Sequence, residues 1–273
     1  MRYFSHEPAR PLGDFIHSFW DSTYAPSHPR VRILPRGTIE IVINLSEDEV
    51  RVYDSGQPEH CRRFPGIVVS GAYAGALDID PMQHASMMGV HFKPGGAFPF
   101  FGAAVGELAN SHLALEILWG RSAIELREKL CSAATTQQRF QILEETLTAR
   151  LRCFSEHPAV SLALGIFGPA GIGDSVRAVA ERVGLSQRRF IQVFTAQVGL
   201  TPKLFCRVLR FKHAREFLNQ PETLNWSQVA LACGYYDQSH LIHDFQEFSG
   251  LSPTDYLCVP GNGLMRSHVL VLG

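Results

Sequence analysis

The chain contains one short pattern twice, about fifty residues apart, and this repeat constrains its fold more than any other feature. Each copy has apolar residues at helical spacing, a glycine, a helix cap and a second apolar stripe that ends in Gly-Leu-(Thr/Ser)-Pro. The matched pairs are Val179 and Val229, Ala180 and Ala230, and Gly184 and Gly234 at an offset of fifty, then Phe194 and Phe245, and Pro202 and Pro253, at an offset of fifty-one. The extra residue lies in the turn, so the copies keep their core and vary their loop.

Each copy is predicted to form two short helices joined by a tight turn. In the first copy, Gly184 ends the first helix and Ser186 offers an N-cap for the second. In the second copy, Asp237 is the expected cap. Phe190 and Phe194 are expected to face the core, which leaves a polar outer face on the second helix. Two such units are typical of helix-turn-helix proteins.

This region resembles the DNA-binding domain of the AraC/XylS family of bacterial transcription regulators. The resemblance covers about residues 158–256, and its most specific parts are the runs GYYDQSHL at 234–241 and GLSP at 250–253. It implies an all-α domain whose two recognition helices enter successive major grooves of double-stranded DNA. Residues 202–219, between the units, are predicted to form one helix of about 25 Å that holds the units apart.

The distribution of charge supports contact with nucleic acid, although the net charge of −1 does not. Residues 177–215 carry nine Lys or Arg against one acid, whereas residues 1–156 carry fifteen basic and eighteen acidic residues. A local basic stripe is the electrostatic signature of phosphate contact. The expected phosphate-binding residues are Arg177, Arg182, Arg207, Arg210 and Lys212.

The residues expected to read bases lie on the outer faces of the second helix in each unit. Arginine can bind guanine through O6 and N7, and glutamine can bind adenine. Ile191 departs from the polar residue that many relatives carry, and it would contact a thymine methyl or rest on the DNA backbone. The full expected set is Gln187, Arg188, Arg189, Ile191 and Gln192 in the first unit and Gln238, Ser239, His240, Ile242 and His243 in the second.

His240 and His243 have the i, i+3 spacing of helical metal ligands. No thiol or carboxylate is placed to complete such a site, because Asp244 is expected to point to the side. We therefore expect no metal and no other cofactor. Partial protonation of the two histidines near neutral pH would make DNA binding mildly pH dependent.

The first 151 residues are predicted to form an α+β domain in which a small sheet precedes several helices. Strands are expected at residues 32–45, 50–53, 67–73 and 87–92, and helices at 12–20, 97–101, 104–110, 114–119, 122–132 and 137–151. The runs LPRGTIEIVINL and GVHFKPGGA, with the segment at 118–127, resemble an N-terminal domain found in one branch of the AraC/XylS family. That resemblance implies architecture but no particular ligand.

The expected organisation has four parts. They are an effector-sensing or dimerisation domain at 1–151, a linker at 152–157, the double helix-turn-helix domain at 158–258, and a tail without legible periodicity at 259–273. A small-molecule effector would change the relation between domains or protomers, with the linker as hinge. The expected partners are DNA, a second copy of the chain, the effector and, as a further candidate, RNA polymerase.

The apolar runs and the spacing of the cysteines are those of an ordinary globular protein. There is no run of eighteen apolar residues and no signal-peptide core, so a cytoplasmic location is expected. The six cysteines lack zinc-binding spacing. Cys206 and Cys233 are expected to be buried thiols, and redox sensing by Cys61 or Cys153 stays open.

An enzymatic function is not expected. A cupin-like metal catalyst would need clustered histidines, but His84 and His91 stand alone on their segments. A methyl-accepting DNA-repair protein would need clustered cysteines in the N-terminal half, which the sequence lacks. The alternative to a DNA-binding regulator is an oligomeric module that binds a small molecule and has only non-specific affinity for DNA.

Overall fold

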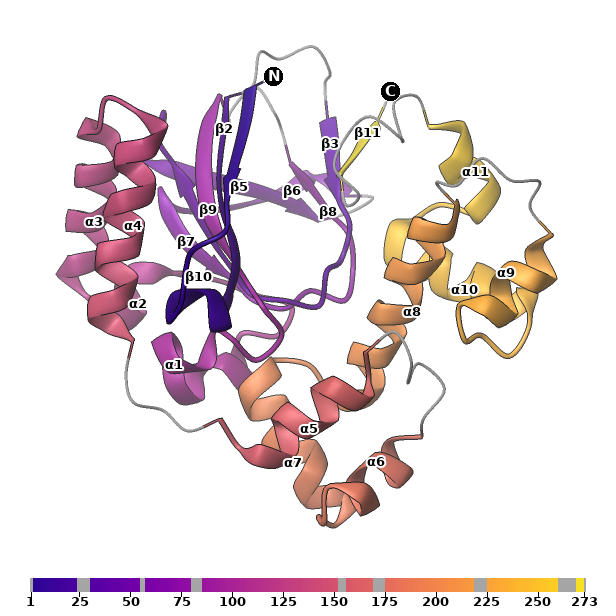
Figure 1. Ribbon diagram of the computed structural model, residues 1–273. Helices are drawn as coiled ribbons and strands as arrows, with labels where there is room; N and C mark the ends of the chain where they lie inside the picture. Colours follow the sequence, from indigo (N-terminus) through magenta and orange to yellow (C-terminus); the bar gives the residue numbers. More distant parts are fainter. Residues whose placement is uncertain are drawn as a thin grey trace.

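A strand-rich N-terminal part is followed by a helical C-terminal part in the computed structural model, as the sequence predicts (Figure 1). The structure describes residues 2–23, 30–54, 57–79, 85–151, 156–168, 175–218, 225–259 and 269–272. Most of the expected linker, residues 152–155, lies outside the described residues, as do residues 260–268 of the expected tail.

Six antiparallel strands form the first sheet, in the order β1-β2-β9-β4-β7-β10. Their bounds are Arg2–His6 (β1), Ile16–Thr23 (β2), Ser86–Phe92 (β9), Glu40–Asn44 (β4), Ile67–Ser70 (β7) and His112–Ala114 (β10). The β4 side chains alternate between two apolar environments. Ile41 and Ile43 join the main core, while Val42 packs with Trp20 between the sheets. Both faces of this sheet are therefore covered.

Five antiparallel strands form the second sheet, in the order β11-β3-β8-β5-β6. Their bounds are Val269–Leu272 (β11), Arg30–Ile33 (β3), Leu77–Ile79 (β8), Glu49–Asp54 (β5) and Gln57–Pro65 (β6). The expected tail thus returns to the N-terminal part of the chain, because β11 pairs with β3 along its whole length. Leu270 in β11 is 1% exposed and belongs to the main core.

Helices α2 (Leu115–Trp119), α3 (Arg121–Ser132) and α4 (Thr136–Arg150) cover the outer face of the six-stranded sheet (Figure 1). Helix α1 (Phe98–Phe101) lies beyond the end of the sheet, on the side of the C-terminal helices, and the 3-10 segment η3 (Gly102–Glu107) follows it directly. The helices expected at 97–101, 114–119, 122–132 and 137–151 are confirmed within two residues at each end. The segment expected as a helix at 104–110 forms a 3-10 helix instead.

The helix predicted at residues 12–20 is wrong. A single 3-10 turn at Leu12–Asp14 (η1) precedes β2, which pairs with β1 on one side and β9 on the other. Phe19 and Trp20 are both buried on opposite faces of the strand, so the apolar run lacks the alternation that would identify it. The strand predicted at 32–45 is in fact two strands, β3 and β4, which are separated where Gly37 adopts a φ of 69°.

Seven helices are described in the C-terminal part. They are α5 (Pro158–Ile166), α6 (Val176–Arg182), α7 (Gln187–Val198), α8 (Pro202–Leu218), α9 (Trp226–Ala232), α10 (Gln238–Ser249) and α11 (Pro253–Cys258). Cys206 and Cys233 are buried as expected, and burial raises the pKa of both thiols to about 11. Among the described residues, no helix has both the length and the apolar character needed to cross a membrane.

One continuous apolar core joins the N-terminal and C-terminal parts. A β-carbon at Gly37 would lie 3.2 Å from Cγ1 of Val208 in α8, so this turn lies directly against the helix between the two units. A β-carbon at Gly106 in η3 would lie 3.1 Å from Cα of Ala196 in α7. The sheets and their loops therefore contact the region that carries the sequence repeat.

Candidate nucleic-acid interface

The first repeat folds into α6 and α7 with the turn that its sequence predicts. Ser175 caps α6 by accepting a hydrogen bond from the Ala178 amide, and Ser186 caps α7 by accepting one from the Arg189 amide. Gly184, in the turn, has a φ of 73°, and Gly199, after α7, has a φ of 88°. A side chain with a β-carbon would be strained at both glycines.

The second repeat folds into α9 and α10 in the same way. The Asp237 carboxylate accepts a hydrogen bond from the His240 amide at 2.8 Å and caps α10. Gly234 and Gly250 occupy the left-handed positions of the turn and the helix end, with φ of 77° and 73°. Both predicted helix-turn-helix units therefore form, with the extra residue of the second copy accommodated before its cap.

Aromatic rings hold the two second helices in place. Phe194 of α7 packs against Phe205 of α8 with ring centroids 5.5 Å apart, and Phe245 of α10 packs against Phe211 of α8 at 5.0 Å. Phe190, Phe194 and Phe245 are fully buried. Burying these faces leaves the opposite faces of α7 and α10 for solvent.

The expected reading face of α7 lies at the surface. Gln187, Arg188, Arg189 and Gln192 are exposed, and Ile191 is half-buried. Ile191 therefore lies closer to the body of the domain than its polar neighbours on α7.

The expected reading face of α10 is more deeply set. Ser239 and His243 are exposed, whereas Gln238, His240 and Ile242 are half-buried. The His240 ring packs edge-on against Tyr235 with centroids 5.2 Å apart, and its Nε2 lies 3.9 Å from Asp244 Oδ2. His240 is therefore partly engaged in packing within the unit.

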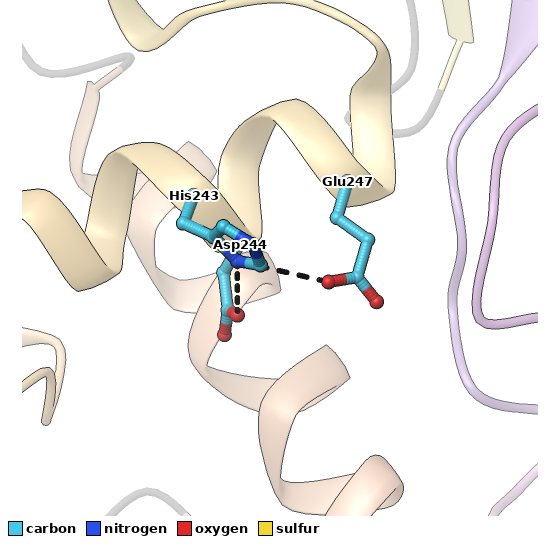
Figure 2. Close-up of side chains that lie close together, drawn as sticks. All are labelled: His243, Asp244 and Glu247. Carbon is cyan, nitrogen blue, oxygen red and sulfur yellow. Dashed lines mark ion pairs between the residues drawn. The ribbon is translucent and has the colours of Figure 1, made fainter.

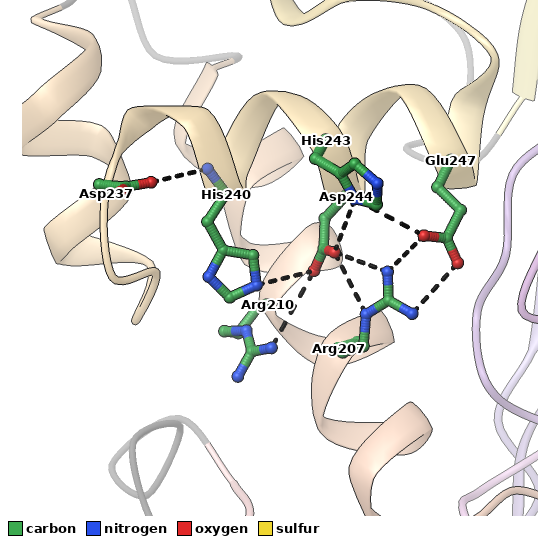
Figure 3. Close-up of polar contacts among 7 residues, drawn as sticks. All are labelled: Arg207, Arg210, Asp237, His240, His243, Asp244 and Glu247. Carbon is green, nitrogen blue, oxygen red and sulfur yellow. Dashed lines mark hydrogen bonds and ion pairs between the residues drawn. The ribbon is translucent and has the colours of Figure 1, made fainter.

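The expected phosphate contacts on α8 are engaged in contacts within the protein (Figure 3). The Arg207 guanidinium donates to Asp244 Oδ1 at 2.7 Å and to Glu247 Oε2 at 2.6 Å. Hydrogen bonding to Glu247 and Asp244 raises the pKa of Arg207. Arg210 lies over the Tyr235 ring at 5.4 Å, with a guanidinium nitrogen 4.0 Å from Asp244 Oδ2. Arg207 thus links α8 to α10.

The remaining expected phosphate contacts lie at the surface. Arg177 and Arg182 are exposed on α6, and Arg177 pairs with Glu181 at 2.9 Å, one turn along the helix. Lys212 on α8 is 3.9 Å from Glu216. Ion pairs this exposed contribute little to stability.

The expectation that Asp244 points to the side is wrong. Asp244 is 1% exposed, and its carboxylate lies with His243 and Glu247 in a group whose possible ligand atoms are within 4.8 Å of one another (Figure 2). The arrangement resembles a metal site in composition, but the Arg207 guanidinium is bonded to both carboxylates. Its positive charge already serves the role that a cation would have there.

The ion pair between Arg207 and Asp244 was not predicted, although the sequence pattern indicates that Asp244 lies on a buried face. Leu241, Asp244, Phe245 and Phe248 recur at i, i+3, i+4 and i+7, which places the carboxylate on the buried face of α10. A charge at a core position needs a partner, and the basic stripe supplies it. The spacing does not say which arginine of the stripe provides the partner.

This duplicated geometry agrees with the comparisons to known proteins. A family model described as a helix-turn-helix domain matches residues 179–257. Over 82 residues, the chain is 32% identical to the "Probable transcriptional regulator LumQ" of Photobacterium leiognathi. Residues 179–257 therefore form a helix-turn-helix domain of the AraC type. The LumQ match covers 30% of this chain and 33% of that protein, so the match spans about a third of the length of this relative.

The N-terminal part matches a second model at residues 4–114, described as a domain of unknown function (DUF6597). Among solved structures, a transcriptional regulator from Chromobacterium violaceum with an AraC-type DNA-binding domain is 26% identical. It covers 38% of this chain and 96% of that one, with a TM-score of 0.34. ToxT from Vibrio cholerae is 10% identical and covers 88% of this chain and 98% of its own, with a TM-score of 0.47.

Proposed function

We propose that this chain is a sequence-specific DNA-binding transcription regulator of the AraC/XylS family. The observation that carries the proposal is the duplicated unit, in which α7 and α10 share the same type of cap, the same glycine end and a polar outer face. The α8 helix between them has 17 residues, which corresponds to about 25 Å. A rigid spacer of this length supports docking of both helices in successive major grooves on one side of the duplex.

We assign the side chains to two roles. Arg188, Arg189 and Gln192 of α7, with Ser239 and His243 of α10, are the exposed candidates for base contact. Arg177 and Arg182 are the exposed candidates for phosphate contact. Arg207 and Arg210 position α10 against α8, because both lie against Asp244.

Selection of bound duplexes from a random DNA pool at near-physiological salt tests the proposal. We expect a motif of two blocks about ten base pairs apart, since successive major grooves recur at that spacing. Binding without enrichment, lost as salt rises, would indicate purely electrostatic contact. If no motif is enriched even when cell extract is added as a source of effector, a small-molecule-binding module is favoured over a sequence-specific regulator.

Replacing Arg188 with alanine should relax the sequence preference at one position of the selected motif. The expected cost is about 1–3 kcal/mol of discrimination at that base pair, the value of a bidentate contact. The matched control is Arg177→Ala on α6, which should weaken all sequences alike and reduce the salt slope by about one. The measurement is binding to a panel of single-base variants of the motif. Equal losses across the panel for both variants would contradict the two roles.

We further infer that the N-terminal part senses a small-molecule effector, mediates dimerisation, or both. The continuous core between the two parts supports transmission of a change from one to the other. An effector acts in this way only if it binds differently to two arrangements of the chain.

A further inference from the structure

A cavity of about 510 Å³ lies between α1, α2 and α4. This volume is within the range of small-molecule sites. The lining residues that the argument uses are Phe100, Phe101 and Gly102 from α1 and the start of η3, Trp119 from α2, and Ala149 and Arg150 from α4. The cavity is separate from the polar faces of α7 and α10.

Part of the cavity wall is aromatic. Phe101 and Trp119 are stacked, with ring centroids 5.7 Å apart and an angle of 25° between their planes. Trp119 is 8% exposed, and its indole Nε1 has no hydrogen-bond partner among the described residues. Parallel rings favour a flat, apolar ligand that extends the stack.

The cavity also has one sign of charge. Arg150 is the only charged residue among the described residues that line it, and its guanidinium carbon lies 4.2 Å from the centroid of the Trp119 ring. Ser122 Oγ accepts a hydrogen bond from one guanidinium nitrogen and helps to orient it. A planar guanidinium that is stacked and oriented in this way matches the geometry of a carboxylate.

The chain segment that lines the cavity continues directly into η3, which packs against α7. Phe100 to Gly102 line the cavity, and η3 then runs on to Gly106. A β-carbon at Gly106 would lie 3.1 Å from Cα of Ala196 in α7, and one at Gly199 would lie 3.4 Å from the Val105 carbonyl oxygen. With so little free space, a shift of the wall must be passed to the end of α7.

We propose that this cavity binds an aromatic carboxylate and that the bound ligand changes the position of α7 through η3. The binding site stands on the cavity itself, whereas the effect on DNA rests on the proposed function. The site lies outside the space between the two sheets, among the helices that precede the C-terminal part.

Calorimetric titration of the full chain with naphthoate tests the binding site. We expect saturable binding of one naphthoate per chain. The neutral analogue naphthamide should have an affinity that is lower by about tenfold or more. Ala149→Trp fills the cavity and should weaken naphthoate binding by about tenfold or more. Thr148→Trp, one residue earlier on α4, is the matched control, because Thr148 is exposed and does not line the cavity. It should bind naphthoate like the unchanged chain.

Arg150 is tested by two substitutions, with circular dichroism used to confirm folding. Arg150→Gln should abolish the preference for naphthoate over naphthamide, and Arg150→Lys should retain part of it. No saturable binding at millimolar naphthoate, or equal binding by Ala149→Trp and Thr148→Trp, would overturn the site. Equal affinity of the unchanged chain for naphthoate and naphthamide would overturn the assignment of a carboxylate.

The effect on DNA is measured separately, so the two proposals fail in different ways. Naphthoate should change the affinity for the selected motif by about fivefold or more, and Ala149→Trp should remove that change. If naphthoate binds but no DNA motif is selected, the proposed function is contradicted and the cavity site is retained. If a DNA motif is selected but naphthoate does not bind, only the cavity site is contradicted. Naphthoate binding that leaves DNA affinity unchanged would overturn the link through η3.

Discussion

Replacing Arg32 with alanine should lower the free energy of unfolding by about 3–5 kcal/mol, as expected when one partner of a buried ion pair is removed. Arg32 donates to both carboxylate oxygens of Asp78 at 2.7 and 2.9 Å, and to the Ser249 carbonyl at 3.0 Å. The Arg32 and Asp78 side chains are only 11% and 6% exposed. The alanine variant would leave a buried carboxylate without its cation and the end of α10 without a donor. Urea denaturation followed by fluorescence measures the loss.

Two further variants separate the charge from the contact with α10. Arg32→Lys keeps a cation but cannot form the bidentate fork, so an intermediate loss is expected. The double variant Arg32→Ala/Asp78→Ala removes both charges and should recover part of the stability. Hydrogen exchange at the end of α10 should rise in both Arg32→Ala variants. A loss below about 1 kcal/mol for Arg32→Ala would indicate that solvent reaches Asp78 and that the pair behaves as a surface pair.

Replacing Arg207 with alanine should cost about 3 kcal/mol of stability, at the lower end of the range for buried pairs. The Asp244 carboxylate would lose its closest cation, while Arg210 and His240 remain within about 4 Å of it. The loss should fall on the contact between α8 and α10. The measurement is thermal or urea unfolding together with DNA affinity at constant salt.

Glu247→Gln provides the matched comparison for Arg207. It removes the exposed partner of the same guanidinium, and its side chain is 44% exposed, so a loss below about 1 kcal/mol is expected. Asp244→Asn should fall between the two variants, because the amide oxygen can still accept a hydrogen bond from Arg207 but the substitution removes the negative charge of the pair. A larger effect for Glu247→Gln than for Asp244→Asn would contradict the assignment of Asp244 as the buried centre of the cluster.

The two arginines hold α10 from different sides. Arg32 reaches the last turn of α10 from the five-stranded sheet, and Arg207 reaches its middle from α8. The position of α10 therefore depends on the N-terminal part as well as on its own unit. The position of α7 depends on the same part through η3 and Gly106. Any change that separates the sheets from the helices would alter the positions of α7 and α10 together.

The repeat was predictable because its signals are local. Ser186 and Asp237 cap their helices, and Gly184 and Gly234 adopt positive φ, as the sequence pattern predicts. The expected exposure of Arg188 also follows from the helical period. These features depend on residues within one or two turns of each other, so a single sequence contains them.

The failures arise where burial or pairing comes from distant parts of the chain. Residues 12–20 are predicted as a helix because Phe15, Phe19 and Trp20 lie at near-helical spacing, and only pairing with β1 and β9 makes residues 16–20 part of a strand that is buried on both faces. The spacing of Leu241, Asp244 and Phe245 places Asp244 on the buried face of α10, but its partner, Arg207, lies on another helix. Local periodicity therefore does not identify that partner.

The sequence by itself determined the two helix-turn-helix units, their caps and turns, the long helix between them and the polar outer faces of α7 and α10. Each of these follows from helical period, capping and glycine conformation, which are short-range properties of the chain. Only the tertiary structure decided that β11 joins β3, that Arg32 reaches Ser249 across 217 positions, and that residues of α1, α2 and α4 line a common cavity. These contacts depend on the arrangement of complete elements, since hydrophobic burial and buried charge pairs select partners by position in space and not by spacing in sequence.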